Sequence, residues 1–339
     1  MITPLALLGY AACASWCVPA LLTPLTRRGV SVRVGLAAWL TAMASVLVSA
    51  VVAIAWSVRA VAADWPRLSQ ALCRSVAGGA CTPEVYRSAL YQTGTAALAV
   101  LLTLLSVVAL WRYGRRVQRS RRQTRAHAEA ARLVGRALTG NAAGDGGRGR
   151  AKTVVLDDPR PAAYCVAGRP AAIVLTSGAL EILDPPQLGA VLAHERAHLA
   201  HGDHFLHTLT QGLAAALPGV PLFSQGAAEV ARLTEMSADD TAARASGRPI
   251  LVAALLAIAT GTAYSAKGFS SKPAPGAAVG DRSVPSGALA AATHAVPARV
   301  ERLLRPSTPG RSAVVTGALT LALAVLAAAP PMLTFLLSQ

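Results

Sequence analysis

Four uncharged apolar segments constrain the fold of this 339-residue chain more than any other feature. As α-helices, segments of this length cross about 30 Å of hydrocarbon, the thickness of a typical bilayer core. No basic leader precedes the first segment, which favours a retained span over a cleaved signal peptide. The sequence therefore predicts a multi-pass protein of the cell membrane with four transmembrane helices, at Ile2–Leu25, Gly35–Val58, Ala89–Trp111 and Ser312–Leu337.

Arginines indicate which side of the membrane each connecting segment occupies, in a chain whose formal net charge is +16. Three arginines and no acidic residue lie between the first two segments. Seven more follow the third segment, and four precede the fourth. Because positively charged connections stay in the cytoplasm, we expect these three arginine-rich regions to be cytoplasmic. Residues 1–111 then form a three-helix membrane region. Its loop at 59–88 and both chain termini are then external.

The predicted external loop also contains two of the five cysteines, Cys73 and Cys81. On an oxidising side of the membrane such a pair forms disulfides. Two unpaired thiols explain the same residues equally well, so both alternatives stay open.

Residues 112–150 are predicted to form a basic juxtamembrane helix followed by a flexible, glycine-rich linker. Contact with the anionic headgroups of the lipid bilayer explains its arginines. Nucleic-acid binding is the alternative explanation for these arginines. The segment lacks interleaved aromatic residues and a recognisable nucleic-acid-binding fold, which argues against a nucleic-acid partner.

Residues 151–311 predict a cytoplasmic α+β domain, mostly helical with a small β-hairpin, ahead of the fourth transmembrane helix at 312–339. The hairpin is expected at Pro161–Ala167 and Ala171–Ser177, on either side of a Gly-Arg-Pro turn. Residues 266–290 are rich in Ser, Pro, Gly and Ala, which predicts a mobile loop.

Local signals also predict where the helices of this domain begin and end. One helix should begin at Asp184-Pro185-Pro186-Gln187, where Asp caps and Pro occupies the first turn, and end near Gly202. A second is expected over Gln225–Ser246. Two further apolar stretches are too short for a transmembrane hairpin. We expect Phe205–Phe223 to be a buried or membrane-resting helix and Ile250–Ser265 to be a core helix.

The sequence His194-Glu195-Arg196-Ala197-His198 matches the pattern H-E-x-x-H. On a helix, residues four apart share a face, so both histidines are placed to bind one metal ion. Water bound to zinc loses a proton near pH 7, and Glu195 is the carboxylate placed to accept it. The motif therefore predicts one Zn²⁺ per chain, with Glu195 as catalytic base.

A tetrahedral site with two histidines and a water still lacks one protein ligand. Glu235 in the later helix is the predicted third ligand, and Asp239, one turn on, is expected to hydrogen-bond a ligating histidine. A surface pair with Arg232 is the alternative for Glu235. Glu229 lies on another face of the helix and is the weaker candidate.

Three further histidines follow the motif at three-residue spacing. A surface cluster at a helix end explains them better than a role in the metal site. Asp203, directly after Gly202, is expected to orient the first helix through hydrogen bonds. The three histidines are His201, His204 and His207.

The stretch AAIVLTSGALEILDPPQLGAVLAHERAHLAHGDH, the EMSADD helix and THAVPARVERLL resemble membrane gluzincin peptidases. The chain is similar to the HtpX and CAAX-prenyl-protease group, and closer to BlaR/MecR-type antirepressor metallopeptidases. This resemblance implies a zincin-like domain with His194, His198 and Glu235 as zinc ligands and Glu195 as the base. It also implies that the hairpin strand ending near Ser177 is the edge strand that aligns the substrate.

Two departures from these families limit the resemblance. The chain ends at Gln339, without the C-terminal penicillin-binding sensor domain of BlaR/MecR, so β-lactam sensing is not implied. Where HtpX-type sequences have Thr-His-Pro, this chain has Thr293-His294-Ala295, which puts a transition-state role for His294 in doubt.

Together these features favour a membrane-embedded zinc endopeptidase that cleaves a cytoplasmic or juxtamembrane protein. The resemblance implies a transcriptional repressor or the chain itself as substrate, in bacterial signalling. The alternative is a catalytically silent signalling or scaffold protein that keeps the peptidase fold. The expected partners are a protein or peptide substrate and the bilayer, and a homodimer is left open.

Overall fold

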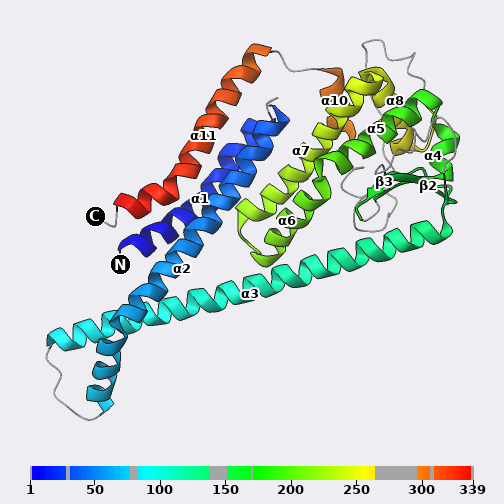
Figure 1. The fold of residues 1–339 in the computed structure, drawn as a ribbon. Helices are drawn as coiled ribbons and strands as arrows, with labels where there is room; N and C mark the ends of the chain where they lie inside the picture. The colour runs from blue at the N-terminus through cyan, green and yellow to red at the C-terminus, as the bar shows by residue number, and fades with distance from the viewer. Residues whose placement is uncertain are drawn as a thin grey trace.

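The computed structural model describes residues 2–27, 31–76, 83–137, 151–168, 171–263, 296–305 and 309–336 (Figure 1). Three long helices at the N-terminus, one small sheet and a group of further helices of 6 to 28 residues follow one another along the chain, which confirms the predicted mostly helical fold. The long helices are α1 (Ile2–Arg27), α2 (Val32–Val76) and α3 (Pro83–Val134). The strands are β1 (Arg136–Ala137), β2 (Lys152–Leu156), β3 (Ala163–Val166) and β4 (Ala172–Thr176). The later helices are α4 (Ser177–Ile182), α5 (Pro185–His201), α6 (Asp203–Ala216), α7 (Pro221–Ser246), α8 (Arg248–Thr260), α10 (Val296–Leu304) and α11 (Pro309–Leu336).

Within the described residues, three helical stretches are long and apolar enough to cross a membrane. They are Thr3–Arg27, Val32–Ala63 and Ala96–Thr124. The fourth predicted span lies in α11, whose apolar part, Thr316–Met332, is shorter.

The predicted external loop at 59–88 is largely helical. The second apolar helix continues to Val76, and α3 begins at Pro83. This α3 is one continuous helix that joins the third apolar segment to the predicted basic helix. Cys81, the glycine-rich linker and the loop at 266–290 lie outside the described residues, so the predictions made for them stay untested.

A hydrogen-bonded chain connects α1, α2 and α11, which lie side by side in Figure 1. Pro330 has no N–H, so the carbonyl of Leu326 loses its donor within α11. The hydroxyl of Ser45 donates to that carbonyl at 2.6 Å. The hydroxyl of Tyr10 lies 2.6 Å from Ser45 Oγ and donates to it. The carbonyl that Pro330 leaves without a backbone donor in α11 is therefore hydrogen-bonded by α2 instead.

Helices α6 and α7 form a hairpin that packs against the long helices, α6 on α3 and α7 on α1 and α2. The prediction of one helix over Phe205–Phe223 is wrong, because α6 ends at Ala216 and α7 begins at Pro221. Gly219 between them has φ +81°, which favours glycine. Leu222, Phe223 and Val230 of α7 share one apolar cluster with residues of α1, α2 and α11.

The sheet has the strand order β1-β2-β4-β3. Strands β3 and β4 form the predicted antiparallel hairpin, with Cys165 opposite Ile173. The far side of β4 pairs with β2 in parallel, so β4 is an interior strand. The expectation that the strand ending near Ser177 is the edge is therefore wrong. Within the described sheet β3 is the edge strand of this hairpin, and β1 lies at the opposite edge. The predicted core helix is confirmed, because Leu251, Val252 and Ala254 of α8 are buried.

Candidate metal centre

Helix α5 presents the H-E-x-x-H motif between two well-defined ends. Oδ1 of Asp184 accepts from the N–H of Gln187 at 2.8 Å, and the Gln187 side chain accepts from the N–H of Asp184 at 3.3 Å. This capping box begins the helix as predicted. Gly202, with φ 69° and ψ 30°, ends it in a left-handed turn. His194 and His198 therefore project from the same face, one turn apart.

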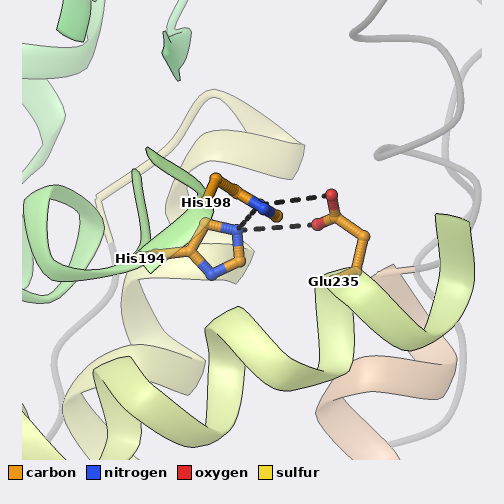
Figure 2. Close-up of side chains that lie close together, drawn as sticks. All are labelled: His194, His198 and Glu235. Atoms are coloured by element: carbon orange, nitrogen blue, oxygen red, sulfur yellow. Dashed lines mark hydrogen bonds and ion pairs between the residues drawn. The ribbon is translucent and has the colours of Figure 1, made fainter. Parts of the chain in front are cut away.

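Figure 2 shows His194 and His198 of α5 pointing toward Glu235 of α7. The Nε2 atoms of the two histidines are 3.1 Å apart. From Glu235, Oε2 lies 3.5 Å from His194 Nε2, and Oε1 lies 3.4 Å from His198 Nε2. The structure thus brings together the three predicted ligands, and their donor atoms lie within 4.8 Å of one another.

These separations fit a tetrahedral zinc ion. Zinc–nitrogen and zinc–oxygen bonds of about 2.0–2.1 Å place neighbouring ligand atoms about 3.3 Å apart. Two imidazoles and one carboxylate are also the ligand set of known zinc hydrolases. The side chain of Glu235 keeps 21% of its surface exposed, so the centre is reachable from outside.

The Nδ1 atom of each histidine lies next to an aspartate carboxylate. Nδ1 of His194 lies 3.1 Å from Oδ1 of Asp239. Nδ1 of His198 lies 2.7 Å from Oδ2 of Asp203. A proton on Nδ1 leaves the lone pair of Nε2 free for a metal. Asp239 therefore lies beside a candidate ligand, at 3.1 Å. Asp203 forms the expected hydrogen bond to the first helix, and its partner there is the candidate ligand His198, which the sequence did not indicate.

Arg299 of α10 is a further member of the centre that sequence reasoning missed. Its Nη1 lies 3.0 Å from Oε2 of Glu235. Its Nε and Nη2 donate to both carboxylate oxygens of Asp239, at 2.7 and 2.6 Å. Only 4% of its side chain is exposed. In the sequence it is one of four arginines that precede the fourth predicted span. Val296, Arg299 and Leu303 recur at helical spacing and share the buried face of α10. That spacing is the signal that could have found it.

The electrostatics of the metal-free centre follow from these contacts. Burial opposes protonation of His198, but its bonds to Asp203 and Glu235 outweigh burial and raise its pKa to about 10. The pKa of His194 is raised for the same kind of reason, against burial, by Asp239 and Glu235. Burial of Glu235 is outweighed by the two histidines and Arg299, which hold the pKa of its carboxyl well below the usual range. A metal ion therefore competes with protons for this site.

Glu195, the predicted base, is buried next to the ligands and faces the edge strand. Burial raises the pKa of the Cys165 thiol on β3, and the nearby carboxylate of Glu195 raises it further. The carboxylate of Glu195 thus lies between the ligand cluster and β3.

The remaining candidates lie outside the cluster of ligands. His201 and His204 are exposed, and His207 forms a 2.7 Å hydrogen bond through Nε2 with Thr234. Arg232 pairs with Glu229 at 2.8 Å, so it is not the partner proposed as an alternative for Glu235. His294 lies outside the described residues.

Comparison with known proteins covers part of the chain. Residues 120–218 match the model of peptidase family M48. The chain is 33% identical over 84 residues to a protease HtpX homolog of Ralstonia nicotianae, which is 24% of this chain and 29% of that protein. It is 38% identical over 68 residues to a protease HtpX homolog of Acidiphilium cryptum, 20% of this chain and 24% of the relative. No solved structure matches.

The match to the family model includes His194 and His198. The chain spans less than a third of the length of either relative, and the family match ends before Glu235. The matches thus show a region similar to peptidase family M48, in a chain that also contains helices long and apolar enough to cross a membrane. The closer kinship with BlaR/MecR stays a prediction.

Proposed function

We propose that this protein is a membrane-embedded zinc endopeptidase that cleaves a cytoplasmic or juxtamembrane protein. One observation carries the proposal: His194 and His198 of one helix converge with Glu235 of another at distances suited to one zinc ion. The aspartates behind both histidines support it, because such partners orient histidine ligands in metal sites.

In this proposal Glu195 is the general base. Zinc, when bound, supplies Lewis-acid chemistry that polarises a peptide carbonyl and makes water more acidic. Glu195 accepts a proton from the attacking water and later returns it to the leaving amine. Its position next to His194 in the sequence, with Cys165 of β3 on its other side, supports this role.

The edge strand is the proposed docking site for the substrate backbone. Among the described strands, β3 pairs with β4 alone, so its outer edge is available to an extended peptide. Peptides that add to a sheet edge are bound by main-chain hydrogen bonds. Because Glu195 contacts Cys165 on this strand, a peptide paired with β3 would pass beside the proposed base.

A cleavage site close to the membrane follows from the position of α7. Its first half packs with α1 and α2, and Glu229 contacts Arg27, the last residue of α1. Glu235 lies six residues further, which is about 9 Å along a helix. The candidate centre is therefore close to the level at which the first apolar helix ends. The arginine distribution places this end on the cytoplasmic side.

The resemblance to BlaR/MecR suggests a role in signalling, with a repressor or the chain itself as substrate. A comparison of protein termini in cells that express the wild type or Glu195→Gln tests the function directly. New termini are expected with the wild type alone, while the purified Glu195→Gln protein still binds zinc. Identical termini, together with purified wild type that holds no metal, would instead favour the silent scaffold.

A further inference from the structure

Glu229, outside the metal centre, lies at the junction between α7 and the end of α1. Its Oε1 accepts from Nε and Nη2 of Arg27, at 3.2 and 3.0 Å. Its Oε2 accepts from Nε and Nη2 of Arg232, at 3.0 and 2.8 Å, and from Thr26 Oγ1 at 3.3 Å. Only 5% of this side chain is exposed. A carboxylate this deeply buried needs such partners, and here they come from two different helices.

The end of α1 is tied to α7 in the opposite direction as well. Since α1 ends at Arg27, its last carbonyls have no donor within the helix. Nη2 of Arg232 donates to one of them, the carbonyl of Thr26, at 3.3 Å. Guanidinium groups also interact favourably with the negative end of a helix dipole. The contact therefore fixes both the depth and the direction of α1 relative to α7.

Helix α7 joins two parts of the molecule. Its first half shares an apolar cluster with α1, α2 and α11. The histidine-bearing α5 contributes Leu188, Val191 and Leu192 to another cluster, which contains the sheet and α8. His194 and His198 thus lie on a helix that packs against the sheet, while Glu235 lies on a helix that packs both against α5 and α8 and against the apolar helices. The metal centre forms where these two parts meet.

The spacing of Glu229 and Glu235 along α7 determines how closely their positions are coupled. Glu229 and Glu235 are six residues apart, so they lie about 9 Å apart along α7 and point about 120° away from each other. A helix carries a shift at one turn to the next with little loss. Metal–ligand distances tolerate changes of only about 0.2 Å, and productive catalytic geometry about 0.5 Å. A small movement of the end of α1 would therefore disturb the position of Glu235.

We propose that Arg27 is a positioning residue, which through Glu229 places Glu235 for metal binding and so couples the first apolar helix to the metal centre. This inference rests on the proposed function. It adds that the geometry of the centre depends on where the end of α1 lies.

The test uses the full chain in lipid nanodiscs, with Arg27→Ala, Arg27→Lys and, as matched control, Arg33→Ala at the start of α2. Zinc affinity is measured by competition with a chelator, and the visible spectrum of the Co²⁺-loaded protein reports ligand geometry. Arg27→Ala should weaken zinc binding, by less than the about 10- to 100-fold typical for loss of a group that contacts a ligand directly, because Arg27 acts through Glu229. It should also change the Co²⁺ spectrum. Arg27→Lys should recover part of both, and Arg33→Ala should match the wild type.

A second measurement separates positioning from folding. Arg27 has 64% of its side chain exposed and is not part of the apolar cluster between the helices, so its removal opens no cavity there. Cleavage of fluorescently labelled casein should show a lower kcat with little change in KM. Arg27→Ala combined with Glu229→Gln should be no worse than the more damaging single variant. Equal zinc affinity and equal Co²⁺ spectra for Arg27→Ala and Arg33→Ala would overturn the inference. Absence of metal binding and cleavage in the wild type would overturn the proposed function instead.

Discussion

Nδ1 of His198 lies 2.7 Å from Oδ2 of Asp203, the first residue of the next helix. The left-handed turn at Gly202 returns the chain so that this carboxylate reaches back to the last turn of α5. The same turn therefore ends the helix and orients His198, a proposed metal ligand.

Replacing Asp203 with Asn should weaken zinc binding about 10- to 100-fold while the fold is retained. The amide can still accept from Nδ1, but it does not support the positive charge that a metal-bound imidazole acquires. Chelator competition measures the affinity, and far-UV circular dichroism checks the fold. Asp157→Asn, a surface carboxylate in the loop after β2, serves as control. Unchanged affinity in Asp203→Asn would remove Asp203 from the centre.

Metal binding should depend steeply on pH. Without metal, and against the effect of burial, the pKa of His198 is raised to about 10 by Asp203 and Glu235, and that of His194 is raised by Asp239 and Glu235, so protons compete with a metal ion for these nitrogens. Zinc needs the neutral imidazoles, so binding releases protons. The apparent affinity should therefore rise about tenfold per pH unit for each proton displaced, between about pH 5.5 and 8. A pH-independent affinity in this range would contradict the charge states assigned here.

The same shifts predict the opposite trend for the stability of the metal-free chain. A folded-state pKa above the unfolded value stabilises the fold fully below the unfolded pKa of about 6.5. This stabilisation is lost as the pH rises through the folded-state value, about 10 for His198. The midpoint of thermal unfolding of chelator-treated protein should thus fall between pH 7 and 10. A midpoint that rises over this interval would show that the histidines are not protonated in the fold.

Arg299→Ala should be far more damaging than Arg302→Ala, its neighbour on α10. Loss of Arg299 leaves the fully buried Asp239 without its main partner, which typically costs about 3–5 kcal/mol. Arg302 pairs with Asp240, and both side chains are about one-third exposed, so its loss should cost about 0–1 kcal/mol. Denaturant unfolding in detergent measures both. Equal effects would mean that the buried pair contributes no more than a surface pair.

The local parts of this structure could be predicted from the sequence. The capping box at Asp184, the left-handed end at Gly202 and the hairpin around Gly168 all depend on neighbouring residues. The break between α6 and α7 also has a local signal, Pro218-Gly219-Val220-Pro221, and the expectation of a single helix overlooked it.

The parts that could not be predicted depend on contacts between distant residues. Arg299 meets Asp239 across 60 positions of the chain. The edge position of β3 follows from the parallel pairing of β2 with β4, which no property of the hairpin itself specifies. The helical position of Glu229 makes it only the weaker candidate ligand, and its contact with Arg27, across 202 positions, has no sequence signal.

Ser45→Ala should loosen the docking of α11, whereas Ser49→Ala, one turn further along α2, should not. Both hydroxyls are buried, but they satisfy different carbonyls. Ser49 donates at 2.8 Å to the carbonyl of Ser45 within its own helix, which also has its ordinary backbone donor. Ser45 donates to Leu326, whose backbone donor is missing because Pro330 has no N–H.

Ser45→Ala therefore leaves the carbonyl of Leu326 unpaired in an apolar environment. This should lower the free energy of unfolding by about 0.6–2 kcal/mol, the range measured for hydrogen bonds between membrane helices. Unfolding in mixed micelles with increasing sodium dodecyl sulfate measures the difference between the two variants. Since Tyr10 donates to Ser45, Tyr10→Phe should add little once Ser45 is already alanine. Equal stabilities of the two serine variants would mean that the carbonyl freed by Pro330 finds another donor.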